Sequence, residues 1–163
     1  MTLETEVYMK KNFVVFALFF AFASIVAHAQ SANSVTNMIN TEKVSWGQVS
    51  YFSAVAQGLV SENASNSEAF AAIQKAGLAD SGKNALSVIS LEELAHVLAQ
   101  TWKVGNSLMY KIHPSPRYAF TMLRANGIIP RNADPSSVPN GHDVLNMINA
   151  VMELSANGRG GNR

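Results

Sequence analysis

The run Ile89-Ser90-Leu91-Glu92-Glu93-Leu94-Ala95-His96-Val97-Leu98 decides the fold class. Ser90 stands three residues before Glu93, and this spacing is that of a capping box, which opens an α-helix. Apolar residues then recur at helical spacing, and the predicted inner stripe consists of Leu91, Leu94, Val97, Leu98, Thr101 and Trp102. Because no segment of the sequence alternates convincingly over five or more residues, we expect an all-α fold.

Similar start and stop signals flank this helix on both sides. Gly77 and Gly127 are expected to end short helices in the left-handed conformation that glycine adopts without penalty. The predicted elements are a long helix capped by Ser45 that stops near Ser61–Asn63, a short helix capped by Asn66 or Ser67, the long helix capped by Ser90, a connector at Lys111–Pro114, a short helix opened by Ser115-Pro116, and a long helix from about Asn140 to Leu154. The domain at 44–154 is therefore predicted to be a five-helix bundle of alternating long and short helices, or about two and a half helix-pair modules.

Two segments carry a resemblance to a known family. The run Tyr118-Ala119-Phe120-Thr121-Met122-Leu123-Arg124-Ala125-Asn126-Gly127-Ile128-Ile129 resembles the short helix and Gly-Ile-Ile turn of S-layer homology modules, and Ile89–Ala95 is similar to the motif that opens their long helix. The resemblance implies a bundle of such modules, many of which hold exported proteins to cell-wall polymers. The glutamate of the motif maps to Glu93, whereas Leu91 replaces the arginine that is a main polymer contact in the family. The third module opening, at Val138–Gly141, does not fit the motif cleanly.

The N-terminus carries an export signal. Lys10 and Lys11 precede an apolar stretch, Phe13–Val26, and the small residues of Ala27-His28-Ala29 follow. Residues 1–29 are therefore predicted to be a signal peptide, with Met9 as the true start because acidic residues precede it. An uncleaved membrane anchor is the alternative.

After cleavage we expect a flexible tether at 30–43, a disordered tail at 155–163, and no stable membrane insertion. The chain has no cysteine, which excludes a disulfide, a thiolate metal site and a lipoprotein anchor. The expected location is periplasmic or secreted.

A basic block supplies the candidate binding surface. Between Leu94 and Ala133 there are five lysines and arginines and no acid. Arg117, Arg124 and Arg131 recur every seven residues, so the first two should share a helix face and the third extends the line. The predicted contact residues are Arg117, Arg124, Arg131, Lys111, Tyr110 and Tyr118. An ordinary solvated face is the other interpretation of the same charges.

The sequence offers little for catalysis. Three histidines follow the signal segment, and none has a second histidine or a carboxylate three or four residues on. Glu92 and Glu93 are explained by helix capping and by the helix dipole. We expect no catalytic residue, metal, cofactor or nucleic-acid partner.

The sequence thus predicts an exported, non-enzymatic helical binding or structural protein of the cell envelope that contacts a cell-wall polymer or an envelope protein. A small exported hydrolase, or a regulator of one, is the alternative.

Overall fold

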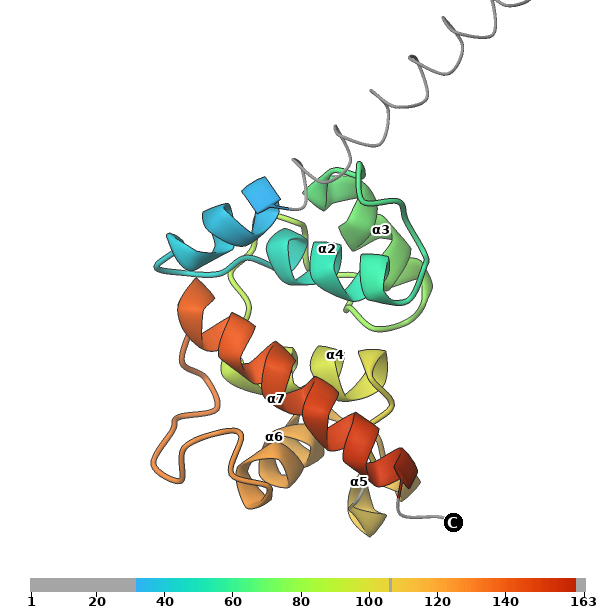
Figure 1. The fold of residues 1–163 in the computed structure, drawn as a ribbon, viewed down its shortest axis with the longest axis vertical. Coiled ribbons are helices and arrows are strands. Elements are labelled where there is room, and N and C mark those ends of the chain that lie inside the picture. Colours follow the sequence, from blue (N-terminus) through green and yellow to red (C-terminus); the bar gives the residue numbers. More distant parts are fainter. Residues whose placement is uncertain (1–31, 106, 161–163) are drawn as a thin grey trace, which may run out of the picture.

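The fold is all-α throughout the described part of the chain (Figure 1). A computed structural model describes residues 32–105 and 107–160, with side chains as far as Asn157. Residues 32–39 are helical. The helices that follow are α2 (Trp46–Ala56), α3 (Asn66–Lys75), α4 (Leu91–Thr101), α5 (Leu108–Ile112), α6 (Pro116–Ala125) and α7 (Gly141–Gly160). The predicted signal peptide, with its expected start at Met9, lies outside the described residues.

Helices α2, α3 and α4 begin at serine capping boxes of similar geometry. In the capping box of α4, the backbone N–H of Glu93 donates to Ser90 Oγ at 3.4 Å, and the backbone N–H of Ser90 donates to Glu93 Oε2 at 2.9 Å. The capping-box prediction for Ser90 and Glu93 is therefore confirmed. The same box opens α2 at Ser45 and α3 at Ser65, so the cap of α3 lies one residue before the predicted pair.

Four helices also end in the same way, with one residue at positive φ. This residue is Gly58 after α2, Gly77 after α3, Lys103 after α4 and Gly127 after α6, with φ of 68°, 76°, 55° and 75°. The next residue is apolar each time, and its N–H donates to a carbonyl five residues back: Leu59 to Ala54, Leu78 to Ile73, Val104 to Ala99 and Ile128 to Leu123. The roles predicted for Gly77 and Gly127 are confirmed. The predicted end of this helix near Ser61–Asn63 is too late, because the turn at Gly58 stops α2 at Ala56.

The caps reveal a repeat that includes the loops. The long helices open at Ser45, Ser90 and Asn140, where the Asn140 side chain accepts from the backbone N–H of Asp143 at 2.9 Å. In the loop before α4, Asn84 Oδ1 accepts from Leu86 N–H, and fifty positions later Asp134 Oδ1 accepts from Ser136 N–H. Equivalent loops therefore lead into α4 and α7.

Three backbone hydrogen bonds of 2.8 Å then link the starts of the long helices in a ring. The N–H of Trp46 donates to the carbonyl of Ser87, and the N–H of Leu91 donates to Ser137. The N–H of Gly141 donates to Thr41 and thereby joins the third long helix to the loop before the first. The three long helices consequently share one cyclic arrangement of their N-termini.

The described part of the predicted tether, residues 32–43, is a folded part of this ring. Residues 32–39 form a helix beside α2, and Met38 is only 1% exposed. This helix precedes α2 as α3 precedes α4 and α6 precedes α7. The structure thus contains three short–long helix pairs where the sequence predicted two and a half, because the polar composition of Ser31–Thr41 obscured a short helix that packs through Met38.

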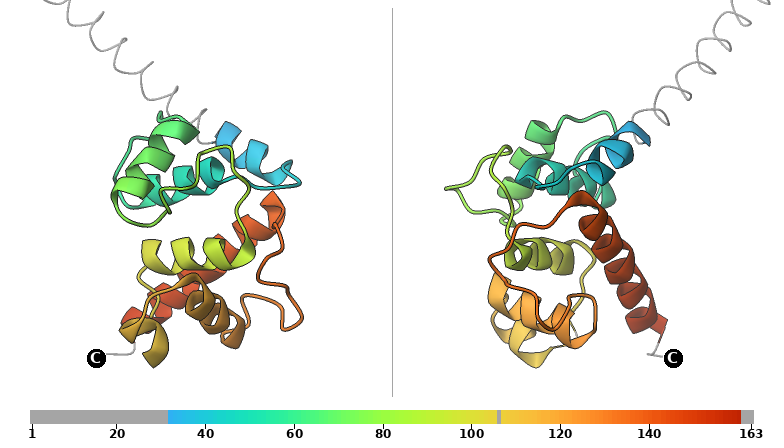
Figure 2. Two further views of the ribbon diagram at one scale, coloured as in Figure 1. Left: turned by 180° about the vertical axis from the view of Figure 1, so that it is seen from behind. Right: turned by 90° about the vertical axis from the view of Figure 1, so that its left-hand side faces the viewer.

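Two further differences concern α5 and the C-terminus. The predicted connector at Lys111–Pro114 contains the end of α5. Residues 155–160, predicted to be disordered, continue α7, and Ser155 Oγ donates to the Trp102 carbonyl at 2.7 Å. That contact secures the C-terminal part of α7 against the end of α4. The views in Figure 2 show α7 running from beside residues 32–39 toward the end of the molecule that carries α5.

The main core lies around α4, whose inner face is fully buried. Leu94, Val97 and Leu98 are inaccessible to solvent and pack with residues of α2, α6 and α7. Trp46 joins this core and meets Phe70 edge-on, with ring centroids 6.1 Å apart. The core therefore includes residues from all three helix pairs.

Candidate ligand grooves

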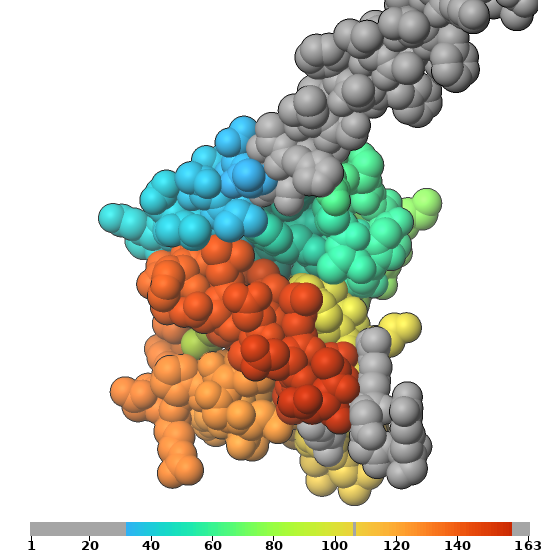
Figure 3. All heavy atoms as spheres, viewed as in Figure 1, coloured from blue at the N-terminus to red at the C-terminus, as the bar shows by residue number. Residues whose placement is uncertain are grey.

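A groove of about 770 Å³ lies between α7 and the loop that joins α6 to α7. We call it the α6–α7 groove, and the face drawn in Figure 3 is hollowed between these two segments. Its polar lining includes four asparagines, Ser137 and three acids, and its apolar lining includes Leu91, Ile128, Met147 and Leu154. No lysine or arginine belongs to the lining in the described part of the chain.

This lining suits an uncharged ligand rich in hydrogen-bonding groups. Each asparagine amide both donates and accepts, and Asn126, Asn146 and Asn157 line the groove along its length. Asp143 is engaged at the start of α7, where its carboxylate accepts from the Asn140 amide at 3.0 Å. The carboxylates disfavour an anionic ligand in this groove because like charges repel.

A second groove, of about 270 Å³, lies at the equivalent position one helix pair earlier. We call it the α2–α4 groove. Six of its lining residues have counterparts in the lining of the α6–α7 groove at offsets of 45 or 50 residues: Trp46 and Leu91, Gly77 and Gly127, Leu78 and Ile128, Asp80 and Pro130, Glu93 and Asp143, His96 and Asn146. The repeat therefore builds the same kind of groove twice.

A third, smaller hollow of about 60 Å³ completes the series. Gln48 and Tyr51 line it from α2, at positions that match Glu93 and His96 of α4. Met38 contributes from the segment 32–39, which takes the place of the short helix. Each of the three helix pairs thus borders one groove.

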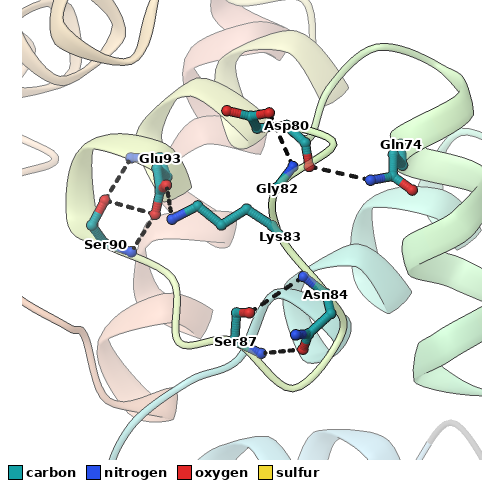
Figure 4. Close-up of polar contacts among 8 residues, drawn as sticks. All are labelled: Gln74, Asp80, Gly82, Lys83, Asn84, Ser87, Ser90 and Glu93. Atoms are coloured by element: carbon teal, nitrogen blue, oxygen red, sulfur yellow. Dashed lines mark hydrogen bonds and ion pairs between the residues drawn. The ribbon is translucent and has the colours of Figure 1, made fainter.

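Glu93 in the α2–α4 groove is held by both of its carboxylate oxygens (Figure 4). Oε1 pairs with Lys83 Nζ at 2.8 Å, and Oε2 accepts from the hydroxyl and backbone N–H of Ser90 at 2.9 Å each. Burial would raise the pKa of Glu93, but the hydrogen bonds from Lys83 and Ser90 outweigh burial, so the pKa is lowered. Glu93 is accordingly a charged structural group and is poorly placed to act as a free general base.

The loop beside Glu93 is similarly braced. Asp80 Oδ1 accepts from the Gly82 N–H at 3.2 Å, and the Asp80 carbonyl accepts from the Gln74 amide at 3.2 Å. Asn84 and Ser87 close the next turn through two side-chain hydrogen bonds of 3.0 and 3.3 Å. These bonds fix the loop that carries one wall of the α2–α4 groove.

His96, which lines this groove and is partly buried, contacts the buried Tyr110. His96 Nδ1 lies 3.3 Å from the Tyr110 hydroxyl, and the two rings meet edge-on. Burial lowers the pKa of His96 and raises the pKa of Tyr110 to about 12. Because Tyr110 is only 5% exposed, its predicted role as a surface contact is corrected: it anchors α5 to α4.

The other predicted contact residues lie apart from the grooves. Arg117 and Lys111 are exposed, and the Arg124 guanidinium lies 5.3 Å from the centre of the Phe120 ring. Tyr118 meets His113 edge-on, and Arg131 follows α6 in a loop, so it does not continue a helical line. None of the six lines any of the three grooves described above.

Sequence reasoning missed the grooves because their lining is assembled from residues far apart in the sequence, from Glu42 to Asn157 in the α6–α7 groove. A usable signal was present, since the offsets that relate the caps also relate the groove residues. A search for polar residues at matched positions of the repeat would have paired His96 with Asn146.

Comparison with known proteins adds no assignment. The chain matches no protein-family model, no curated protein and no solved structure. The resemblance to S-layer homology modules stays a prediction.

Two further functional features are absent from the described residues. Within residues 32–105 and 107–160, no three histidine or acidic side chains are placed to hold a metal ion. None of the helices described there has the length and apolar character needed to cross a membrane.

Proposed function

We propose that this protein is an exported, non-enzymatic binding protein of the cell envelope and that its ligand is a cell-wall polymer. The observation that carries the proposal is the recurrence of equivalent grooves around the ring of helix pairs. A repeated groove suits a ligand that itself repeats, because successive units of a polymer can occupy successive sites and raise the overall affinity. The expected signal peptide and the resemblance to S-layer homology modules support an envelope location.

The lining of the α6–α7 groove favours an uncharged stretch of polymer, such as a glycan strand. Asn126, Asn146 and Asn157 offer donors and acceptors to hydroxyl and amide groups, and Met147 and Leu154 give an apolar floor. The predicted basic block would instead attract an anionic polymer through a different face. The two modes differ in their response to salt, since screening weakens attraction between charges more than hydrogen bonding between neutral groups.

Cosedimentation of the exported protein with purified cell-wall sacculi tests the proposal. We expect the protein to pellet with the sacculi and to remain bound when the salt concentration is raised. Soluble fragments released from the sacculi should compete. A protein that stays in the supernatant at low salt would overturn the proposed function, whereas binding that vanishes at high salt would place the contact on the basic block.

The second candidate function is a small exported hydrolase, or a regulator of one. It is favoured by the three carboxylates of the α6–α7 groove, Glu42, Asp143 and Glu153, because glycoside hydrolysis uses a pair of carboxyl groups. Asp143 and Glu153 are ten residues apart on α7, which is about 15 Å along the axis. That exceeds the roughly 6.5–9.5 Å of an inverting pair, so α7 alone does not supply one.

Release of soluble fragments from sacculi decides between binding and hydrolysis. We expect no release above a protein-free control. Release that disappears in Glu42→Gln combined with Asp143→Asn would establish the hydrolase instead.

A further inference from the structure

The helix α5 is an insertion relative to the internal repeat. Seven positions separate Gly58, at the end of α2, from the cap Ser65 of α3. Twelve positions separate the equivalent Lys103 and Ser115. The five extra positions match the five residues of α5, Leu108–Ile112. Because α2 and α3 connect without such a helix, α5 is not needed to join one helix to the next.

The insertion exposes an unusual amount of apolar surface. Leu108 is 70% exposed, Met109 57% and Ile112 70%, all within this one short helix. Leu108 and Ile112 are four residues apart and therefore lie on the same side of α5. No side chain caps α5 at its start, and the buried Tyr110 holds it against His96. Helix α5 lies at one end of the molecule (Figure 1), and it carries these three exposed apolar side chains.

Cations accompany these apolar side chains. Lys111 belongs to α5 and passes over Gly105, with carbon atoms 3.8 and 3.9 Å from the position of a Cβ there. Lys103 and Arg117 are exposed at the ends of the neighbouring helices α4 and α6. Among the acids of the elements packed nearby, Glu92 and Glu93 are at the opposite end of α4 from α5. Glu153 of α7 lines the α6–α7 groove and lies two residues before Ser155, which contacts Trp102.

We propose that α5 docks the protein onto an anionic lipid surface, with Leu108, Met109 and Ile112 inserted among the lipids and the cations on the headgroups. A second copy of this chain is a poor occupant because it would bring like charges together. Three side chains of one helical turn also provide far less than the roughly 800 Å² that each partner buries in a standard protein interface. A lipid surface accepts a small apolar tip without shape complementarity, and nearby cations add attraction to anionic headgroups.

Cosedimentation with vesicles tests this proposal. The probes are vesicles of mixed phosphatidylglycerol and phosphatidylcholine, compared with vesicles of phosphatidylcholine alone. All variants are purified after export with the same N-terminus, so that this segment contributes equally. We expect the wild-type protein to bind the anionic vesicles, more weakly as salt rises, and to bind the neutral vesicles much less.

Two pairs of variants locate the contact. Leu108→Ser with Ile112→Ser should lower binding to anionic vesicles roughly tenfold or more, because each methylene group withdrawn from the lipid weakens attachment. Leu86→Ser is the matched control, since Leu86 is 89% exposed but lies outside α5. Lys103→Glu with Lys111→Glu should also weaken binding, whereas the same reversal at the exposed Lys43 and Lys75 should change it little.

The outcomes are decisive in both directions. If the wild-type protein binds neither kind of vesicle, the proposal is overturned. An acidic protein partner would then be the remaining candidate for α5. Full binding by the Leu108→Ser, Ile112→Ser variant would overturn it as well. The α5 residues line none of the three grooves, so sacculi binding can fail or succeed independently of the vesicle result.

Discussion

At the scale of single residues, the fold depends on polar groups that satisfy the ends of short helices. A helix of ten or eleven residues leaves a large share of its backbone groups without partners inside the helix. In α4, Ser90 and Glu93 satisfy the first of these groups, and the N–H groups of Lys103 and Val104 close the last turn. Individual caps should consequently have measurable effects on stability.

The cap at Ser90 gives the first prediction. Ser90→Ala removes the hydroxyl that accepts from the Glu93 N–H and is expected to lower the free energy of unfolding by about 0.5–2 kcal/mol. Urea unfolding measures the change. Ser61→Ala, at an exposed serine outside the caps, should stay within about 0.5 kcal/mol of wild type. Equal effects of the two substitutions would show that Ser90 does not act as a cap.

Lys103 gives a prediction of opposite sign. It is the single non-glycine residue at positive φ in the described part of the chain, and it occupies the position that glycine fills after α2, α3 and α6. Lys103→Gly should therefore raise the free energy of unfolding by about 1 kcal/mol, because the left-handed conformation strains a side chain. Lys75→Gly, inside the last turn of α3, should lower it by a similar amount. A destabilised Lys103→Gly protein would contradict the account of this turn.

His96 makes stability depend on pH. Burial lowers the pKa of His96 in the folded protein below the ordinary value of 6.5, so the unfolded chain binds more protons just below that pH. Stability should fall as the pH is lowered through 6.5 toward the folded-state pKa. His96→Gln should flatten this part of the profile in pH-dependent urea unfolding. An unchanged slope in His96→Gln would exclude His96 as the cause.

At the scale of helices and loops, the sequence was informative wherever the signal was local. The caps at Ser90 and Glu93 and the turns at Gly77 and Gly127 depend on residues a few positions apart, and the structure confirms them. The helix at 32–39 and α5 were missed because both are short and are held by long-range contacts of single residues, Met38 and Tyr110. The composition of a short segment does not predict contacts with residues far away in the sequence.

The same reason explains what was missed at the candidate site. The spacing of Arg117, Arg124 and Arg131 suggested a continuous stripe, but α6 ends at Ala125 and the chain turns away at Gly127 before it reaches Arg131. The grooves arise only when helix pairs pack together, so their lining is not adjacent in sequence. Repeat offsets, rather than local motifs, were the useful guide to them.

The hydrogen bond from Gly141 to Thr41, which closes the ring, leads to a prediction about the position of α7. A Cβ at this position would collide with the backbone carbonyl of Met38, so Gly141→Ala should separate α7 from the segment 32–39. We expect a loss of about 1–3 kcal/mol in unfolding free energy and faster proteolysis after residue 39. The control is Gly82→Ala, where the nearest atom of the surroundings is 4.0 Å away. Wild-type stability of Gly141→Ala would mean that the ring is not closed by this contact.

At the scale of the whole molecule, three helix pairs share one core and place a groove beside each long helix. The pairs are not copies in chemistry, because Glu93 in one groove is neutralised by Lys83 while Asp143 in the next is not paired with a base in the described structure. Of the three grooves, the α6–α7 groove has the most amide side chains in its lining. We therefore propose that the α6–α7 groove makes the main polymer contact and that α5 makes a separate contact with a lipid surface.

Sacculi binding by groove variants tests this central claim most directly. Asn146→Ala combined with Asn157→Ala removes two amides of the lining, and Asn149→Ala removes an exposed amide of α7 outside it. The account predicts that the double variant binds sacculi about tenfold more weakly, as expected for the loss of two hydrogen bonds, at both low and high salt. The control should bind like the wild type. Wild-type binding by the double variant, or its loss only after Arg117→Glu with Arg124→Glu, would contradict the assignment of the groove.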